Sequence, residues 1–270
     1  MISLVQGVAL VTGGGRGLGN AVATSFAQHG CQKIVILDVL PNDIMETAKG
    51  ELEKLGVEVL TLDCDVSDEA AVQQAVQAVV DKFGRIDFAV NCAGIIGPHQ
   101  TTDSMDIDAF NKTIRINTIG VLTCMKYQIQ QMKCQEPIKL AHRDSSQRGA
   151  IVNFASVNSI LGSHSIGAYA TSKHAVLGLT KTAALENRDK QIRINCLSPG
   201  YIWSAIAEQT IKRIPESVAK WNDSQMRQGR TCYADEIGDA TVALCSPLLS
   251  IVNAHNLVCD NGFTQTADRG

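Results

Sequence analysis

Short apolar segments alternate with helical patterns along almost the whole chain. The apolar segments are rich in Val, Ile and Leu and mostly lack polar alternation, which is typical of strands buried on both faces. They cover residues 8–12, 33–38, 58–63, 88–91, 150–155, 193–198 and 256–259. Helical patterns lie between them at 18–29, 44–55, 69–82, 107–133, 168–187 and 234–244. We therefore expect an α/β fold, a doubly wound parallel β-sheet of about seven strands with helices on both faces, in three α/β/α layers.

Size and composition narrow the class of protein. The 270 residues contain neither an internal repeat nor a low-complexity linker, so we expect residues 1–270 to form a single domain. A formal net charge of −3 gives no sign of a nucleic-acid partner, and no apolar run approaches the roughly 18 residues of a membrane span. The N-terminus lacks a basic signal region. Nine cysteines without Cys-x-x-Cys spacing indicate reduced thiols in a cytoplasmic protein and no metal site.

Two polar segments interrupt the alternation. Residues 134–149 are long for a connection between a helix and a strand, and we expect a surface loop there. Residues 201–230 carry Trp203, Trp221, Ile206 and Ile211 among polar residues. This segment leaves the carboxyl end of a predicted strand, where open α/β sheets bind ligands, so it could form a substrate lid. The alternative is a helical excursion that only packs on the core.

The first predicted strand runs directly into a glycine-rich turn, which a helix follows. Glycines permit a tight turn and a close approach of the backbone to a pyrophosphate, while the first N–H groups of the helix face the anion. The pattern predicts a dinucleotide site that includes Gly13, Gly15, Arg16, Gly17, Leu18 and Gly19. The alternative, a merely flexible loop, is disfavoured by the strand–turn–helix context.

Asp38 and Arg16 give opposite indications about the dinucleotide. Asp38 ends the second predicted strand, where a carboxylate binds the hydroxyls of an adenosine ribose and repels a 2′-phosphate. Arg16 lies in the glycine turn, where a guanidinium could pair with a 2′-phosphate. We weight Asp38 more heavily and predict NAD(H), with NADP(H) not excluded. Asp38 could also be a simple turn residue.

Tyr169 and Lys173 are four residues apart in a predicted helix and therefore share one face. A lysine ammonium favours the phenolate and lowers the pKa of a neighbouring tyrosine from its usual value of about 10. Such a tyrosine can exchange a proton with a substrate oxygen near neutral pH, and Ser156, thirteen residues earlier, could contribute a hydroxyl. By itself the pair could equally be two neighbours on a surface helix.

The chain resembles the classical short-chain dehydrogenase/reductase family, which has a Rossmann-type fold, over essentially its whole length. The resemblance depends on Thr12-Gly13-x-x-x-Gly17-x-Gly19, Asp65-Val66, Asn91-Cys92-Ala93-Gly94, Asn117, Ser156, Tyr169-x-x-x-Lys173 and Pro199-Gly200. Each motif is modest alone, but in this order and at these distances the set is specific. Two departures are Cys92, where the family often has a second asparagine, and Ser204, where a threonine is usual.

The resemblance implies a role for each matching residue. Tyr169 would be the general acid/base, Lys173 would bind the nicotinamide ribose and lower the tyrosine pKa, and Ser156 would orient the substrate oxygen. Asn117 would hold a water for proton relay. The cofactor would further meet Asp65, Val66, Asn91, Ala93, Gly94, Pro199, Gly200, Ile202 and Ser204. Relatives commonly form homodimers or homotetramers.

These residues predict an NAD(P)(H)-dependent oxidoreductase that interconverts a secondary alcohol and a ketone. The positions that would flank the site are aromatic, apolar or moderately polar, which suits a mid-sized apolar molecule; they are Ile95, Ile96, His99, Asn158, Ser159, His164, Tyr201, Trp203 and Trp221. His164 could be a second acid/base or a loop residue, and we favour the loop. Alternatives are an epimerase or lyase of the same fold and a non-catalytic nucleotide sensor or scaffold protein.

Overall fold

A seven-stranded parallel sheet forms the centre of the protein. The computed structural model describes residues 4–140, 144–203 and 217–265. The sheet has the order β11-β8-β7-β4-β1-β2-β3, and every neighbouring pair in it is parallel. Its strands are β1 (Val8–Thr12), β2 (Lys33–Asp38), β3 (Glu58–Asp63), β4 (Phe88–Asn91), β7 (Gly149–Phe154), β8 (Ile192–Pro199) and β11 (Asn256–Cys259). The fold class is as expected, with shifts of one residue at β7 and β8.

The strand order reverses direction at the centre of the sheet. From β1 the chain moves outward through β2 to β3, then returns to β4 on the other side of β1 and continues to β7, β8 and β11. Thr12 and Asn91, which end β1 and β4, are paired in register. A crevice at the carboxyl ends of strands at such a reversal is where open α/β sheets bind ligands.

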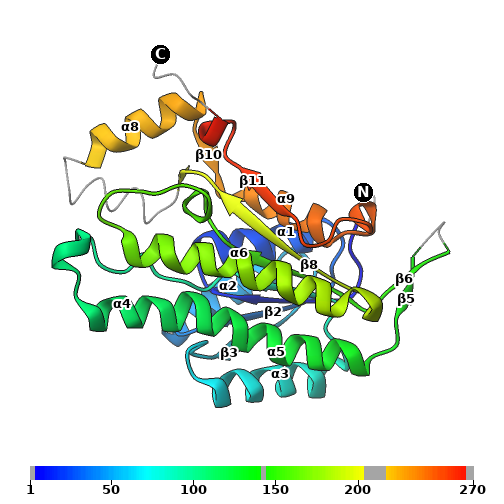
Figure 1. Cartoon of the computed structure of the whole chain (residues 1–270). Helices are drawn as coiled ribbons and strands as arrows, with labels where there is room; N and C mark the ends of the chain where they lie inside the picture. Colours follow the sequence, from blue (N-terminus) through cyan, green and yellow to red (C-terminus); the bar gives the residue numbers. More distant parts are fainter. Residues whose placement is uncertain (1–3, 141–143, 204–216, 266–270) are drawn as a thin grey trace.

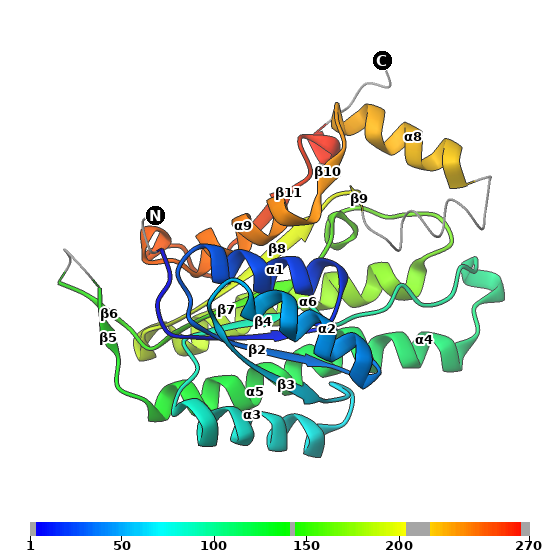
Figure 2. The same cartoon turned by 180° about the vertical axis from the view of Figure 1, so that it is seen from behind.

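Helices cover both faces of the sheet and enclose two apolar cores. One face carries α1 (Gly17–Gln28), α2 (Asn42–Glu53) and α9 (Ala234–Cys245), whose apolar residues pack in one cluster with Val11, Ile36 and Val90. The other carries α3 (Glu69–Phe83), α5 (Gly120–Cys134) and α6 (Gly167–Asn187), which pack with Leu10, Val35 and Ile151. Figures 1 and 2 show the sheet between these two layers. Successive strand residues alternate between the cores because side chains of a strand point alternately to either face.

The expected helix at 107–133 is not uniform. It consists of α4 (Ile107–Ile114), a π-helical segment η2 (Arg115–Ile119) and α5. The π turn accommodates an additional residue without ending the helix. Asn117 lies within η2 and is completely buried, so the irregular turn directs an amide into the protein.

The expected loop at 134–149 contains a short antiparallel hairpin, β5 (Ile138–Lys139) with β6 (Ser146–Gln147). The hairpin protrudes from the end of the molecule opposite α8 (Ser217–Gln228) (Figures 1 and 2). Buried Gln135 fixes its base, because its side-chain amide donates to the carbonyls of Ile86 (2.7 Å) and Arg148 (2.6 Å) and accepts from Ile86 N–H (3.1 Å). The side chain of Gln135 therefore replaces part of a strand ladder.

The segment at 201–230 contains β9 (Ile202–Trp203) and α8, and β9 pairs in parallel with β10 (Cys232–Tyr233). Ser204, Ile206 and Ile211, which were part of the sequence prediction, lie outside the described residues.

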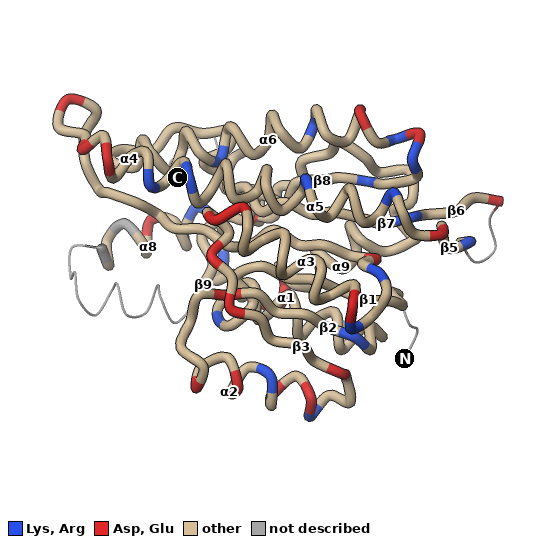
Figure 3. Tube along the Cα trace, turned by 90° about the horizontal axis from the view of Figure 1, so that it is seen from below, with Lys and Arg blue, Asp and Glu red and all other residues tan. Residues whose placement is uncertain are grey.

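Figure 3 shows acidic and basic residues interspersed along the helices, as α2 illustrates. Within the described ranges, no helix combines the length and the apolarity that crossing a bilayer requires.

Candidate active site

The glycine turn between β1 and α1 is tightly packed inside and open outside. Gly13 has a φ of 69°, and a Cβ there would lie 2.9 Å from the Cα of Ala93. A Cβ on Gly19 would collide with the carbonyl oxygen of Gly13. Gly17 also has a positive φ, 61°, but a Cβ there would have no atom within 4 Å. The turn therefore excludes side chains against the protein and leaves one side open to a ligand.

The first turn of α1 has no side-chain cap. Its N-cap residue, Arg16, is exposed and makes no capping hydrogen bond. By contrast, Asp68 and Asp106 cap α3 and α4, each accepting two backbone N–H groups. Uncapped N–H groups at the positive end of a helix dipole, beside a turn without side chains, suit a phosphate group.

Asp38 lies beside this turn, at the end of β2. Its carboxylate accepts hydrogen bonds from Gly15 N–H (3.0 Å) and Val39 N–H (2.9 Å). A Cβ on Gly15 would lie 3.1 Å from Oδ2 of Asp38, so the glycine permits this approach. The structure thus places the Asp38 carboxylate against the glycine turn. Leu18, half-buried, follows in the first turn of α1.

Thr12 joins the glycine turn to the loop after β4, although the sequence prediction gave it no role. Its hydroxyl accepts hydrogen bonds from the N–H groups of Cys92 (3.1 Å) and Ala93 (3.2 Å). A hydroxyl at the end of a strand next to a glycine turn was the available signal.

Cys92 stays a neutral thiol, because burial raises its pKa to about 12. Nearby Lys173 acts in the opposite direction and lowers this pKa, while Asp38 makes a smaller contribution that raises it.

The side chain of Asn91 is directed into the protein. It is buried, donates to Oε1 of Gln128 (3.0 Å) and Oδ1 of Asn153 (2.8 Å), and accepts from Nε2 of Gln128 (2.8 Å). Asn153 in turn donates to Thr180 Oγ1 (2.9 Å). Asn91 can therefore face a ligand through its main chain only, and its amide holds β4, β7, α5 and α6 together.

Lys173 and Tyr169 share one face of α6, as their spacing predicted. The Lys173 ammonium is 5% exposed, lies 5.6 Å from the centroid of the Tyr169 ring and donates to the Phe154 carbonyl (2.7 Å) at the end of β7. Tyr169 is half-buried, and its hydroxyl makes no hydrogen bond to any described residue. A buried cation held by one carbonyl is a strong local electrostatic source because little water screens it.

Asn117 closes the inner side of this arrangement. Its side chain accepts from Ile95 N–H (2.8 Å) and donates to the Ile95 carbonyl (2.8 Å) and to Ser172 Oγ (3.0 Å). A Cβ on Gly94 would lie 3.1 Å from Asn117 Oδ1 and 3.7 Å from Lys173 Nζ. Gly94, Asn117 and Lys173 therefore meet at one point, beside the loop that Thr12 attaches to the glycine turn.

Ser156 follows β7 and begins the short helix η3 (Val157–Ser159). It is 7% exposed, and its Oγ accepts from Asn158 N–H (3.2 Å). η3 packs on α6, which brings Ser156 to the element that carries Tyr169, although their hydroxyls are not bonded to each other. His164 lies on the exposed loop before α6, next to Ser165 Oγ (2.6 Å). Its position agrees with a loop residue.

The other predicted cofactor residues that the structure describes lie at the same edge of the sheet. Asp65 is exposed after β3 and accepts from Ser67 N–H (2.8 Å), while buried Val66 packs on Gly120. Pro199 ends β8, Gly200 donates to the Cys259 carbonyl (2.9 Å), and Ile202 is 9% exposed.

Tyr201, Trp203 and Trp221 form an aromatic cluster. The ring centroid of Trp221 lies 6.4 Å from that of Tyr201 and 5.5 Å from that of Trp203.

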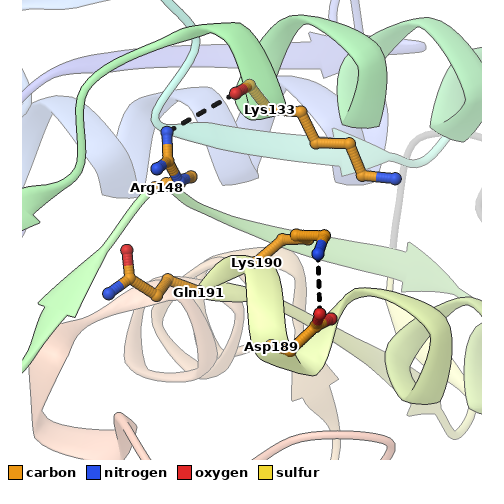
Figure 4. A pocket seen from close by; sticks show the side chains of 5 residues that line it. All are labelled: Lys133, Arg148, Asp189, Lys190 and Gln191. Carbon is orange, nitrogen blue, oxygen red and sulfur yellow. Dashed lines mark hydrogen bonds and ion pairs between the residues drawn. The ribbon is translucent and has the colours of Figure 1, made fainter.

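A hollow of about 400 Å³ lies at the opposite edge of the sheet, where β7 and β8 begin. It is lined by Lys133, Arg148, Asp189, Lys190 and Gln191 (Figure 4). The Lys190 ammonium contacts Asp189 at 2.7 Å, and Arg148 donates to the Lys133 carbonyl at 3.4 Å. None of the predicted site residues lines it.

Comparison with known proteins agrees with this geometry. The family model described as Enoyl-(Acyl carrier protein) reductase matches residues 13–264. Levodione reductase of Leifsonia aquatica is 36% identical over 260 residues, covering 94% of this chain and 93% of that protein. The short-chain dehydrogenase fogB of Aspergillus ruber is 35% identical over 276 residues, covering 97% and 98%.

Solved structures give the same result. The crystal structure of levodione reductase has a TM-score of 0.85 at 34% identity, covering 96% of this chain and 98% of that one. That of NAD⁺-bound xylitol dehydrogenase also has a TM-score of 0.85, at 31% identity, covering 95% and 98%. With the glycine turn, Asn117, Ser156, Tyr169 and Lys173 at one edge of a seven-stranded parallel sheet, the chain belongs to the short-chain dehydrogenase/reductase family of oxidoreductases.

Proposed function

We propose that the protein is an NAD(H)-dependent oxidoreductase that interconverts a secondary alcohol and a ketone of mid-sized, apolar character. The observation that carries this proposal is the buried Lys173 ammonium, which lies beside the Tyr169 ring and next to Gly94 and Asn117. A buried cation beside a phenol whose hydroxyl has no partner among the described residues is suited to proton exchange with a substrate. The same edge of the sheet offers an uncapped helix for a pyrophosphate.

The bound dinucleotide supplies or accepts the hydride. The proposed cofactor contacts are Gly13, Gly15, Arg16, Gly17, Leu18, Gly19, Asp38, Asp65, Val66, Asn91, Ala93, Gly94, Pro199, Gly200, Ile202 and Ser204, and Lys173 binds the cofactor ribose. Tyr169 and Ser156 donate hydrogen bonds to the substrate oxygen, where negative charge grows during reduction. Tyr169 then transfers its proton to that oxygen, and the Lys173 ammonium stabilises the phenolate left behind. Asn117 holds the water that returns a proton to the site.

Asp38 supports NAD(H) over NADP(H). Its carboxylate is fixed by the N–H groups of Gly15 and Val39 at the phosphate turn, so it cannot easily move away from a 2′-phosphate. Arg16 is exposed and makes no capping bond, so it is free to adopt other positions. Placing a 2′-phosphate next to the fixed Asp38 carboxylate is unfavourable, and an exposed ion pair with Arg16 would contribute too little binding free energy to offset this repulsion.

The aromatic cluster supports an apolar substrate. Tyr201 and Trp203 at the start of the 201–230 segment pack against Trp221 of α8, and we propose this segment as the substrate lid of a single domain spanning 1–270. Two relatives, levodione reductase and (+)-borneol dehydrogenase 2 of Salvia officinalis, have names that refer to small alicyclic molecules. The borneol dehydrogenase is 33% identical over 276 residues, covering 98% of this chain and 92% of that protein. A homodimer or homotetramer in the cytoplasm completes the proposal.

Steady-state kinetics with NADH and NADPH over a panel of alicyclic and aliphatic ketones tests both the reaction and the cofactor. We expect NADH to be preferred, and Asp38→Asn to reduce that preference by about tenfold or more because a charge-assisted hydrogen bond is lost. Asp63→Asn is the matched control, because Asp63 of β3 is exposed and is paired in register with Asp38 of β2. Tight NADH binding without turnover would favour a sensor protein, and turnover without net redox change would favour an epimerase or lyase.

A further inference from the structure

Gln228, the last residue of α8, connects the proposed lid to the turn at 199–202. Its Oε1 accepts from Tyr201 N–H (2.7 Å), and its Nε2 donates to the Tyr201 carbonyl (3.0 Å). The side chain is 1% exposed. One primary amide thus pairs with both main-chain groups of a single residue, as a neighbouring strand would.

The contact between Gln228 and the turn is closely packed on both sides. A Cβ on Gly200 would collide with Oε1 of Gln228 and lie 2.9 Å from Cβ of Asp260. The main-chain carbonyl of Gln228 accepts from the Asn261 side chain, and Gly229 ends the helix with a φ of 74°. The end of α8, the turn after β8 and the segment after β11 are therefore held in one arrangement.

The aromatic cluster makes a second connection along the same helix. The Tyr201 ring packs edge-on against Trp221 of α8 and against Phe263, whose centroid is 5.2 Å away, and the Arg227 guanidinium stacks on Phe263 at 3.9 Å. The ring of Tyr201 thus faces the lid while its backbone is bound by Gln228. A shift of α8 cannot leave the 199–202 turn in place unless these bonds break.

We propose that Gln228 is a positioning residue that fixes the nicotinamide-facing turn Pro199–Ile202 and couples it to the position of α8. This inference rests on the proposed function, in which that turn borders the nicotinamide. Gln228 itself touches neither cofactor nor substrate. Its loss should weaken cofactor binding and loosen α8 together, whereas loss of a lid contact alone should affect only the ketone.

Glutamate at this position provides a reversible test. A carboxylate has acceptors but no donor, so one oxygen would oppose the Tyr201 carbonyl. A protonated carboxyl group restores one acceptor and one donor. Burial disfavours the charged form, so protonation should occur at a pH above the ordinary glutamate range.

The surroundings of Gln228 contain few titratable groups that could produce the same pH response. Cys232 Sγ lies 3.6 Å from Nε2, and burial raises the pKa of this thiol. The Asp260 carboxylate is occupied by the N–H groups of Gly262 (2.9 Å) and Thr264 (2.8 Å). Arg230 and Glu236 are paired at 2.6 Å, and the Arg230 guanidinium lowers the Glu236 pKa. Arg227 on α8 is stacked on Phe263, and all of these groups are unchanged in the variants.

The experiment compares Gln228→Glu and Gln228→Leu with the wild type from pH 5.5 to pH 8, measuring KM for NADH, kcat and hydrogen exchange of the Tyr201 amide. At pH 8 we expect KM for NADH to rise about tenfold in both variants, since each leaves the Tyr201 carbonyl without its donor. On acidification the glutamate variant should regain the wild-type KM, whereas the leucine variant should not. Exchange at Tyr201 should be faster wherever KM is raised.

Gln225→Glu is the matched control, because Gln225 lies one turn earlier on α8 and its buried amide has no hydrogen-bond partner among the described residues. Its KM for NADH should equal that of the wild type at every pH. Wild-type KM and Tyr201 protection in both Gln228 variants would overturn the proposal while leaving the oxidoreductase function intact. If the wild type turns over no ketone, the exchange data still decide whether Gln228 fixes the turn, and unchanged protection would again overturn it.

Discussion

The two edges of the central sheet differ in how they hold their polar side chains. At the carboxyl edge, Asn117 and Lys173 are buried and bonded to main-chain groups, and Asp38 is held by two backbone N–H groups. At the amino edge, Lys133, Asp189 and Lys190 are exposed around a hollow of about 400 Å³. The hollow at the amino edge is lined by exposed charges. The carboxyl edge, which borders a second hollow of about 300 Å³ at the end of β11, holds its charges by main-chain hydrogen bonds and carries the family motifs.

This difference indicates that a site is recognised by positioned groups rather than by empty volume. Exposed ion pairs such as Lys190–Asp189 are screened by water and contribute little. A buried ammonium that is held by one carbonyl keeps its orientation without a ligand, so less reorganisation is needed when charge develops on a substrate. The comparison predicts that substitutions at the carboxyl edge lower kcat. Substitutions at the amino edge should leave kcat unchanged, and only those of buried residues should lower the free energy of unfolding.

The largest effect is expected for Tyr169→Phe. The variant keeps the ring beside Lys173 but has no proton to transfer, so kcat should fall by about 10³-fold while NADH binding is retained. Single-turnover kinetics and NADH fluorescence titration separate the two. Tyr127→Phe removes only an exposed hydroxyl bonded to Glu69 and should leave kcat unchanged. Full activity in the Tyr169 variant would show the proposed mechanism to be wrong.

Asn117→Leu should follow, with kcat lowered by about 10²-fold because the proton relay loses its anchor. The substitution also removes the two part-buried hydrogen bonds to the N–H and carbonyl of Ile95, each of which contributes about 0.5–1.5 kcal/mol. Thermal unfolding and kcat are measured on the same samples. The control is Thr118→Ala, in the same π segment as Asn117. It removes a 3.3 Å hydrogen bond to the Ser172 carbonyl of α6 and should retain kcat.

Arg193→Met should lower stability but not turnover. This arginine is the second residue of β8, at the amino edge, is 6% exposed, and donates to Gln147, Val252, Cys245 and Ser246 at 3.0 to 3.3 Å. Burial lowers its pKa, and methionine would remove four hydrogen bonds, leaving Gln147 Oε1 and the Cys245 carbonyl without this donor while the Val252 and Ser246 carbonyls keep others; we therefore expect a loss of about 3 kcal/mol in the free energy of unfolding. Arg188→Met, in an exposed turn, is the control. A loss of kcat at temperatures where the variant is folded would contradict the division between the two edges.

The smallest effect is expected for Lys133→Ala combined with Lys190→Ala. Both side chains line the amino-edge hollow and are exposed, so kcat/KM should stay within about twofold of the wild type. The measurement is the same steady-state assay over the ketone panel. A drop of tenfold or more would give this hollow a role in the reaction that its geometry does not suggest.

Sequence patterns were sufficient for the strands and for the position of the main motifs. β1, β2, β3, β4 and β11 begin and end as expected, because runs rich in branched apolar residues favour strands; β1 and β4 are buried along their whole length. The spacing of Tyr169 and Lys173 likewise placed both on one face of α6. These features depend on residues close together in the chain.

Features that depend on distant residues were not predicted. The π segment at 115–119 accompanies the bonds of Asn117 to Ile95 and Ser172. The hairpin at 134–149 depends on Gln135 reaching Ile86, and the inward direction of the Asn91 amide depends on Gln128 and Asn153. No local periodicity contains such information, because each contact joins residues more than twenty positions apart.

The sequence by itself determined the alternation of strands and helices, the glycine turn and the identity of the polar residues that meet at the carboxyl edge. Only the tertiary structure decided which of these side chains gather at the candidate site and which hold elements together. Lys173 lies beside Tyr169, whereas the Asn91 side chain bonds inside the protein and Gln228 joins α8 to the turn after β8. The physical reason is that a buried polar group must find a partner, and packing between distant segments determines which partners are within reach.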